Sequence, residues 1–209
     1  MNKDQKMKIF CIGRNYAAHA AEMGSKVPSE PLIFMKPPSA ILANNKPLYY
    51  PEFTNDLHYE GELVFRICKN GKHVAPEFAA SYIDAVAFGI DFTARDLQSK
   101  FKEKGQPWEL AKGFDNSAAL SSFIPIEEFG RTKDISFTLH KNGNQVQEGS
   151  TAQMIFDIPS IITYVSKFIK VQSGDYIFSG TPVGVGPVQI GDKLTGFIEG
   201  REMLQCEIR

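Results

Sequence analysis

Apolar positions recur with helical spacing in one stretch near the C-terminal third of the chain. Six apolar residues after Asp157 fall at offsets 0, 3, 4, 7, 10 and 11, and they are Ile158, Ile161, Ile162, Val165, Phe168 and Ile169. This spacing places all six on one face of an α-helix, and Asp157 is a favoured residue type for the N-cap. The pattern predicts an amphipathic helix that begins directly after Asp157.

Two shorter helices are predicted nearer the N-terminus. Thr93 is a capping residue type with Asp96 three residues further on, and Leu97 and Phe101 then share an inward face. Another helix is predicted from residue 15 to residue 23, where the following glycine is suited to end it.

Asn-Gly dipeptides between strand-like runs predict antiparallel hairpins. Asn70-Gly71 follows the apolar run 63–67, and Asn142-Gly143 follows the run 135–139. Both dipeptides suit type I′ turns, because asparagine and glycine accept positive φ angles. The chain is therefore expected to form a single mixed α/β domain over residues 1–209, with a first strand at 8–14 and antiparallel sheet dominating.

Composition narrows the classes of function. The 209 residues are 43% hydrophobic and 22% charged, which is typical of a globular protein and not of a disordered one. A formal net charge of −1 argues against a nucleic-acid partner, and no apolar run reaches the roughly 20 residues of a membrane span. No secretory signal is recognisable, and the three cysteines have no metal-site spacing. A cytoplasmic protein with reduced cysteines is expected.

Paired glutamates are the sharpest chemical feature of the sequence. Glu60 and Glu62 lie in the run His58-Tyr59-Glu60-Gly61-Glu62, directly before the apolar Leu63-Val64-Phe65. On a strand they point to one face with Cα atoms ~6.5–7 Å apart, and such carboxylates repel unless a cation lies between them. Hard oxygen ligands of this kind favour Mg²⁺, Mn²⁺ or Ca²⁺ over zinc.

A third acid stands at the end of another apolar run. Asp91 follows residues 85–90 and precedes the helix expected after Thr93. The three acids fit a metal site, but they also fit two solvent-facing glutamates on an edge strand beside a capping aspartate. Spacing alone leaves both interpretations open. His58 shares the face of the glutamates and is expected to be a neighbour of the site, not a ligand.

Several motifs in order along the chain resemble the fumarylacetoacetate hydrolase family, closest to its short acylpyruvase and oxaloacetate decarboxylase branch. The likeness extends from Ile9 to Ile208. The stretches that carry it are Ile12-Gly13-Arg14-Asn15-Tyr16, Phe34-Met35-Lys36-Pro37, His58-Tyr59-Glu60-Gly61-Glu62, Asp91-Phe92-Thr93-Ala94-Arg95-Asp96, Trp108-Glu109-Leu110-Ala111-Lys112 and Ser179-Gly180-Thr181-Pro182-Val183-Gly184-Val185-Gly186.

The resemblance implies a fold and a set of site residues. The fold is a mixed α/β, β-rich β-roll like the C-terminal domain of fumarylacetoacetase, with a few peripheral helices. Mg²⁺ or Mn²⁺, with Ca²⁺ as a further choice, is held by Glu60, Glu62 and Asp91. Residues 15–30 are implied to form a mobile lid over the substrate.

Catalytic and binding roles follow from the same resemblance. His19 and Glu22, spaced i, i+3, are implied to activate water, because a carboxylate can orient a neutral imidazole as a base. Lys112 is implied to stabilise a developing enolate. The implied substrate-binding residues are Arg95, Gln98, Gly180 and Thr181. On sequence alone each of these has a bland alternative, namely an ordinary helix surface or a surface lysine.

The expected function is that of a divalent-metal-dependent enzyme that cleaves a C–C bond of a small 2-oxo acid or diacid through a metal-bound enolate. Acylpyruvate hydrolysis and oxaloacetate decarboxylation both fit. Alternatives are an isomerase or tautomerase of a 2-oxo diacid or 2-hydroxydienoate (2-hydroxyhepta-2,4-diene-1,7-dioate isomerase type), a fumarylpyruvate hydrolase, and a ureidoglycolate lyase. A non-catalytic small-molecule sensor is the alternative from another class. The resemblance further implies a homodimer.

Overall fold

A computed structural model describes residues 7–22, 27–130 and 134–209. Within them, the largest sheet has eight strands. In spatial order its path runs through β2 (Leu32–Lys36), β1 (Ile9–Gly13), β12 (Tyr176–Phe178), β5 (Gly61–Ile67), β6 (Ile83–Asp91), β8 (Ala118–Leu120) and β3 (Ile41–Ala43), with β9 (Ile124–Pro125) paired to β6. The β1–β12 and β3–β8 pairs are parallel and the others antiparallel. The predicted mixed, β-rich fold is confirmed.

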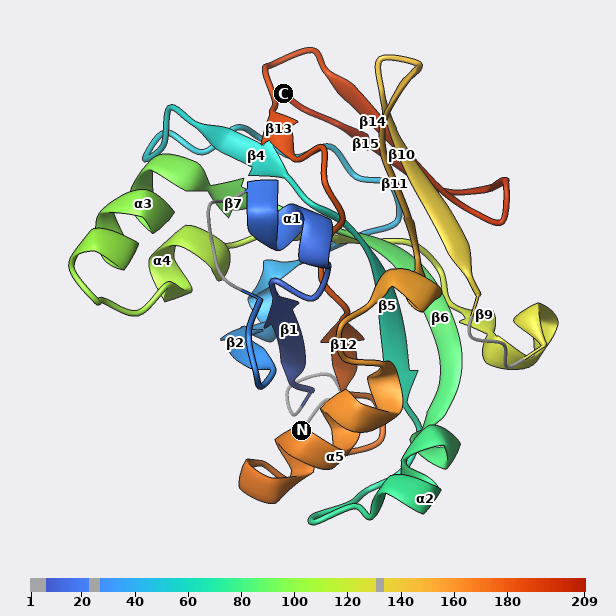
Figure 1. Cartoon of the computed structure of the whole chain (residues 1–209). Helices are drawn as coiled ribbons and strands as arrows, with labels where there is room; N and C mark the ends of the chain where they lie inside the picture. Colours follow the sequence, from blue (N-terminus) through green and yellow to red (C-terminus); the bar gives the residue numbers. More distant parts are fainter. Residues whose placement is uncertain (1–6, 23–26, 131–133) are drawn as a thin grey trace.

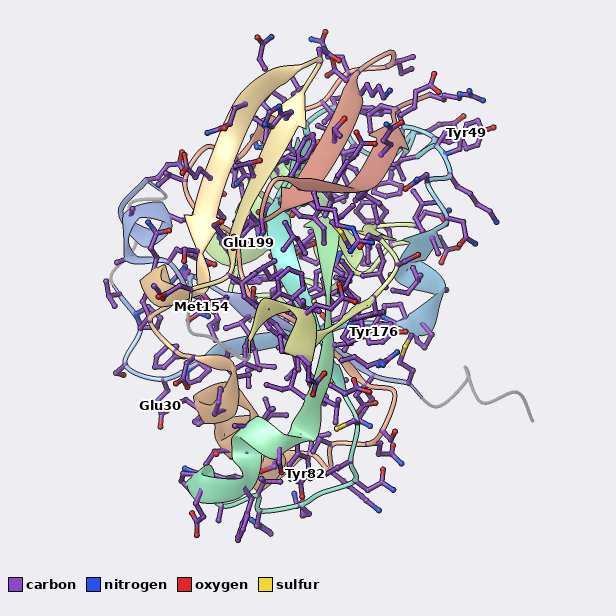
Figure 2. The ribbon with its side chains drawn as sticks, turned by 90° about the vertical axis from the view of Figure 1, so that its right-hand side faces the viewer. Glu30, Tyr49, Tyr82, Met154, Tyr176 and Glu199 are labelled. Carbon is purple, nitrogen blue, oxygen red and sulfur yellow. The ribbon has the colours of Figure 1, made fainter. Side chains whose placement is uncertain are left out.

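Two smaller sheets complete the β structure of the described residues. The four-stranded sheet has the order β11 (Asn144–Ser150), β10 (Ser136–Lys141), β14 (Lys193–Ile198) and β15 (Arg201–Glu207). The three-stranded sheet has the order β13 (Gly186–Pro187), β4 (Leu57–Tyr59) and β7 (Thr93–Ala94). In Figure 2 the four-stranded sheet lies at one end of the molecule, and Tyr82, next to α2, lies at the other.

Short helices surround the sheets (Figure 1). The α-helices are α1 (Ala17–Glu22), α2 (Pro76–Ala79), α3 (Arg95–Glu103), α4 (Glu109–Lys112) and α5 (Ile158–Phe168). The 3-10 turns are η2 (Pro38–Ala40), η3 (Ala80–Tyr82), η4 (Ile126–Phe129) and η5 (Thr151–Gln153). None of the helices in the described part of the chain combines the length and apolarity needed to cross a bilayer.

The four-stranded sheet packs closely against the long central strands. The rings of Phe88 on β6 and Phe137 on β10 meet edge-on with centroids 6.1 Å apart. A Cβ atom at Gly196 on β14 would lie 2.3 Å from the Phe88 ring, so only glycine allows this approach. The core therefore packs against β6 close to its end at Asp91, where the acidic residues lie.

The helix expected after Asp157 is confirmed in its start and its buried face. The Asp157 side chain accepts a hydrogen bond of 2.9 Å from the amide of Ser160, as an N-cap does. Four of the six expected apolar residues are buried, while Phe168 is 66% exposed at the helix end and Ile169 lies just beyond it. The apolar pattern extends one residue past the helix, because Ile169 is its C-cap in extended conformation.

The hairpin at Asn142-Gly143 is confirmed, and the one at Asn70-Gly71 is wrong. Residues 142 and 143 have φ angles of 53° and 83° and join β10 to β11. After β5 the chain instead bridges from Gly71 to Val171, because Tyr82 and Val74 close around Gly71 and the strand β5 already pairs with β6 and β12. Tertiary pairing has replaced a local turn.

Thr93 does not cap a helix. It belongs to β7, pairs with His58 of β4, and leaves Ala94 at the N-cap position of α3 without a side-chain bond. The buried residue of α3 is Gln98, while Leu97 and Phe101 are only partly buried. The expected third helix is present as α1, and its predicted end at residues 23–24 lies outside the described residues.

Candidate active site

The three acids predicted as metal ligands converge where β4, β5 and β6 meet. Glu60 occupies the single position between β4 and β5, Glu62 is the second residue of β5, and Asp91 is the last residue of β6. The amide of Asp91 donates to the carbonyl of Glu60 over 2.8 Å, which fixes the register that brings the side chains together. The three residues are 6%, 2% and 0% exposed, and one carboxylate oxygen from each lies within 4.8 Å of the others.

Basic side chains surround two of these carboxylates. The Lys112 ammonium lies 2.7 Å from Glu60 Oε2 and 2.8 Å from Asp91 Oδ2. Arg95 Nη2 lies 2.8 Å from the other oxygen of Glu60. Burial works against the charge of Glu60, but Lys112 and then Arg95 outweigh it and hold the pKa of Glu60 well below its usual range. Burial also works against the charge of Lys112, yet Asp91 and Glu60 raise the pKa of that lysine. Both groups are therefore charged at neutral pH.

Glu62 stands apart from these ion pairs. Its Oε2 accepts a hydrogen bond of 2.8 Å from the amide of Gly180, and among the described residues no basic side chain pairs with it. Burial, followed by the charges of Asp91 and Glu60, raises the pKa of Glu62 well above its usual value. Three buried, close carboxylates, one of them without a cation, fit a hard divalent ion that accepts one oxygen from each.

Lys36 completes the base of the cluster, although the sequence assigned it no role. Its ammonium lies 2.8 Å from Asp91 Oδ1 and donates to Ser117 Oγ at 2.9 Å and to the carbonyl of Lys112. A lysine that ends the apolar run 32–35 is the sequence signal that could have found it. In the structure this lysine is 2% exposed, and a buried ammonium group requires partners.

The predicted catalytic pair lies on α1, in front of the cluster. His19 Nδ1 is 3.0 Å from Glu22 Oε2, so this pair is in hydrogen-bonding contact. The other carboxylate oxygen of Glu22 accepts a bond of 3.1 Å from the amide of Gly184, in the loop that follows β12. His19 is 6% exposed and lines the same cavity as the three acids. Figure 1 shows α1 between β1 and the β4–β7 pair.

Three of the predicted substrate-binding residues, Arg95, Gln98 and Thr181, line the same cavity, and the fourth, Gly180, is bonded to Glu62 beside it. Arg95 donates to Gln98 Oε1 over 2.8 Å, one turn along α3. Thr181 donates to the carbonyl of Gly61 over 2.9 Å. Gly180 has a φ of 96°, and a Cβ there would lie 2.9 Å from the carbonyl oxygen of Ile12, so the loop requires glycine at this position.

His58 does not join the acidic cluster, and its Nε2 lies 2.8 Å from Asp56 Oδ1. Three further residues around the site were assigned no role in the sequence analysis. They are Arg14 and Lys102, which line the cavity, and Gln147, which lies buried behind it. Because they come from three distant segments, no local spacing could have linked them to the acids.

Comparison with known proteins identifies the same scaffold. Residues 8–209 match the family described as fumarylacetoacetate (FAA) hydrolase C-terminal. The chain is 44% identical over 197 residues to oxaloacetate tautomerase YcgM of Escherichia coli, covering 94% of this chain and 90% of that protein. It is 44% identical over 192 residues to the human mitochondrial oxaloacetate tautomerase FAHD1, covering 92% and 87%.

A solved structure agrees with both. The fumarylpyruvate hydrolase of Pseudomonas aeruginosa, in complex with Mn²⁺ and pyruvate, superposes with a TM-score of 0.92 at 37% identity, covering 96% of this chain and 88% of that one. Sequence and fold agree over nearly the whole chain, so this protein belongs to the fumarylacetoacetate hydrolase family.

Proposed function

We propose that this protein is a divalent-metal-dependent enzyme that forms the enolate of a small 2-oxo diacid. The observation that carries the proposal is the buried cluster of Glu60, Glu62 and Asp91, which shares one cavity with the Lys112 ammonium and the His19 imidazole. A base in this cavity can take a proton from a carbon next to a keto group. The cation and a metal held by the acids can stabilise the negative charge that then develops on the keto oxygen.

Mg²⁺ or Mn²⁺ is the proposed cofactor, held by Glu60, Glu62 and Asp91, because all three offer carboxylate oxygens and no softer donor. Ca²⁺ is compatible with the same donors. Bound there, the ion supplies a Lewis acid for the oxygens of the substrate. The Mn²⁺ and pyruvate in the fumarylpyruvate hydrolase structure support both the metal and the 2-oxo acid.

The chain's own groups orient and stabilise the substrate. Arg95 presents its guanidinium toward the cavity for a substrate carboxylate, and Gln98 presents its amide beside it. Lys112 keeps its ammonium at the acids, where it stabilises negative charge that develops on a substrate oxygen. Gly180 and Thr181 form one side of the site, where the Gly180 amide donates to Glu62 and the Thr181 hydroxyl donates to the carbonyl of Gly61.

His19 is the proposed base. Since its Nδ1 is engaged by Glu22, its Nε2 is the atom free to take a proton, either from water or from carbon. Proton transfer from water leads to hydrolysis of an acylpyruvate, and the loss of CO₂ from oxaloacetate passes through the same type of enolate. Transfer of a proton between that carbon and the enol oxygen, with no C–C bond broken, is tautomerisation. This second candidate is favoured by the names of the two relatives, both oxaloacetate tautomerases.

A panel assay tests the proposal. Oxaloacetate, acetylpyruvate and fumarylpyruvate are each supplied with Mg²⁺, with Mn²⁺ and with EDTA, and both enol–keto exchange and pyruvate release are followed. We expect turnover of at least one substrate that stops in EDTA and returns with added metal. Exchange without pyruvate release identifies a tautomerase, and pyruvate release identifies C–C cleavage. Turnover that persists in EDTA, or none with any substrate, contradicts the proposal.

A homodimer in the cytoplasm is also proposed. None of the three cysteines forms a disulfide within the described residues, and two of them are buried, which supports a reducing compartment. Light scattering on the purified protein tests the dimer, with a mass of twice 23.3 kDa as the expected result.

A further inference from the structure

Two cations at the cavity have no acidic partner among the residues that the structure describes. Arg14 and Lys102 line it together with Glu60, Glu62 and Asp91. Arg95 and Lys112, in the same cavity, are each paired with a carboxylate at 2.7–2.8 Å. Within the described part of the chain, neither Arg14 nor Lys102 forms an ion pair. Their positive charge is therefore available to an anion that enters the cavity.

The backbone fixes the position of Arg14. Its φ of 59° lies in the left-handed region, which is unfavourable for a non-glycine residue and persists only where neighbours hold it. The next residue supplies that hold through its side chain. Asn15 Nδ2 donates to the carbonyls of Ser179 (2.8 Å) and Phe156 (3.0 Å), and Asn15 Oδ1 accepts from the backbone amide of Phe156 (2.8 Å).

Lys102 is aimed at the same space from α3. Arg95, Gln98 and Lys102 follow the helical spacing i, i+3, i+7 and all three line the cavity. The Lys102 ammonium lies 5.4 Å from the centroid of the Trp108 ring. Partial burial, followed by the charges of Arg95 and Arg14, lowers the pKa of Lys102, so these cations repel one another across the cavity.

We propose that Arg14 and Lys102 form an anion subsite for the second carboxylate of a dianionic 2-oxo acid. The inference rests on the proposed function, in which Arg95, Gln98 and the metal site take the 2-oxo acid end. A carboxylate at the other end of the substrate then relieves the repulsion between Arg14 and Lys102. A substrate that is neutral at that end leaves the repulsion unrelieved. The enzyme is accordingly selective for 2-oxo diacids over monoacids.

The test compares charge variants on substrates that differ in charge. Arg14→Met and Lys102→Met are assayed on oxaloacetate and fumarylpyruvate, which are dianions, and on acetylpyruvate, a monoanion. We expect KM to rise about tenfold or more for the dianions and to stay within about twofold for acetylpyruvate. Lys104→Met, on an exposed lysine just beyond α3, is the matched control and should change neither. An equal rise for all substrates, or no rise, overturns the subsite.

Thermal shift separates this inference from the proposed function. With Mg²⁺ present, oxaloacetate should raise the wild-type Tm more than pyruvate does, and the difference should vanish in Arg14→Met. This measurement does not need turnover. A wild type that turns over no substrate contradicts the proposed function, while an unchanged difference in Arg14→Met contradicts the subsite.

A separate observation concerns Gln147, a fully engaged amide 2% exposed on β11. Its Oε1 accepts from the amide of Gly61 at 2.8 Å. Its Nε2 donates to Thr181 Oγ1 at 2.8 Å and to the carbonyl of Pro182 at 3.0 Å. Since Thr181 in turn donates to the carbonyl of Gly61, both peptide groups of Gly61 are held by this pair of side chains.

Gly61 is the residue between the two glutamates of the cluster. The hydrogen bonds that hold its backbone therefore also set the positions of the Glu60 and Glu62 side chains. A Cβ atom at position 61 would lie 3.1 Å from Gln147 Oε1 and 3.2 Å from the Phe88 ring, which leaves little room for the backbone to shift. We infer that Gln147 is a positioning residue, which fixes the separation of Glu60 and Glu62 and the direction of the Thr181 hydroxyl from another sheet.

Metal affinity tests this role directly. In Gln147→Met, and in the shorter amide Gln147→Asn, the Kd for Mn²⁺ measured by calorimetry should rise about 10–100-fold, as it does when a group that orients a ligand is lost. Gln145→Met, on the exposed part of the same strand, is the control and should bind Mn²⁺ as the wild type does. The Tm in EDTA shows that each variant is folded. An unchanged Kd in either folded Gln147 variant overturns the role.

Discussion

At the scale of the residue, Glu60 has two roles. Each of its oxygens meets a cation, Lys112 on one side and Arg95 on the other, and it is also one of the three acids that fit a metal ion. A neutral amide of the same shape keeps the volume and removes the charge. The substitution therefore separates electrostatics from packing.

We expect Glu60→Gln to weaken Mg²⁺ or Mn²⁺ binding at least about 100-fold and to abolish turnover, because one of three anionic ligands is lost. Calorimetry measures the affinity, and Glu148→Gln, an exposed acid on β11, is the control. Full turnover and unchanged metal binding in Glu60→Gln would mean that the cluster is not the metal site.

His19→Ala should separate hydrolysis from tautomerisation. Loss of a positioned base should slow a hydrolytic step ~10²–10⁴-fold, while metal affinity barely changes because His19 is not among the three acids. Glu22→Ala should be milder, since it removes orientation and leaves the imidazole. Rates of acylpyruvate hydrolysis and of enol–keto exchange are measured side by side. Equal loss of both would assign His19 to general proton transfer and favour the tautomerase, and no loss of either contradicts its catalytic role.

At the scale of elements, α1 is held over the site by few contacts. Glu22 bonds to Gly184, but Ala17 and Ala18 are exposed and add no apolar burial. A helix of six residues has little stability of its own. We expect the amides of residues 17–22 to exchange with solvent faster than those of β5 and β6, and to become protected when Mg²⁺ and oxalate are added. Exchange as slow as in β5 without ligand would contradict a mobile lid.

The start of α3 depends on Asp96, not on Thr93. The Asp96 side chain accepts from Thr54 Oγ1 at 2.6 Å and from the amides of Asn55 (3.1 Å) and Leu97 (2.8 Å). Burial opposes its charge, but the hydrogen bonds together, with that from Thr54 first, outweigh it and lower the pKa of Asp96. A carboxyl whose pKa is lower in the folded state stabilises the protein above its unfolded pKa, and this stability is lost as the pH falls.

Asp96→Asn should therefore lower the Tm at neutral pH, and the gap to wild type should close as the pH falls below about 4. The expected loss near pH 7 is about 0.3–1 kcal/mol, typical of an acid in the first turn of a helix. Thermal unfolding in EDTA across pH measures it. Glu103→Gln, at the other end of α3, should show no such gap, and a gap that widens toward acid pH would contradict the assignment.

At the scale of the whole molecule, the basic side chains pair with Glu60 and Asp91 but leave Glu62 without a cation among the described residues, so a divalent ion bound among the three acids should stabilise the fold. A metal at about 100 times its Kd should stabilise the fold by about 2.7 kcal/mol, and for a chain of this size the Tm should rise by roughly 5–11 °C. Thermal unfolding with Mg²⁺, with Mn²⁺ and with EDTA measures the effect, and Glu60→Gln should lose it. No rise in the wild type would contradict a resident metal.

Local patterns were sufficient where a neighbour in sequence decides the outcome. The cap and buried face of α5, the turn at Asn142-Gly143 and the apolar run that ends at Asp91 all depend on residues a few positions apart. The resemblance further identified the acids that the structure brings within 4.8 Å of one another. The cap, the turn and the apolar run are encoded locally, because helix capping, helix periodicity and turn angles each need only a short segment.

Tertiary structure decided what distant segments do to one another. Gly71 bridges to Val171 instead of closing a hairpin, because β5 finds its partners in β6 and β12. Thr93 pairs as a strand residue because β4 lies beside it. Lys36 and Gln147 become part of the site because their polar groups are buried. A buried ammonium or amide must form hydrogen bonds with the groups packed around it. The choice of those partners is a property of the packed fold, and no short window of the sequence contains it.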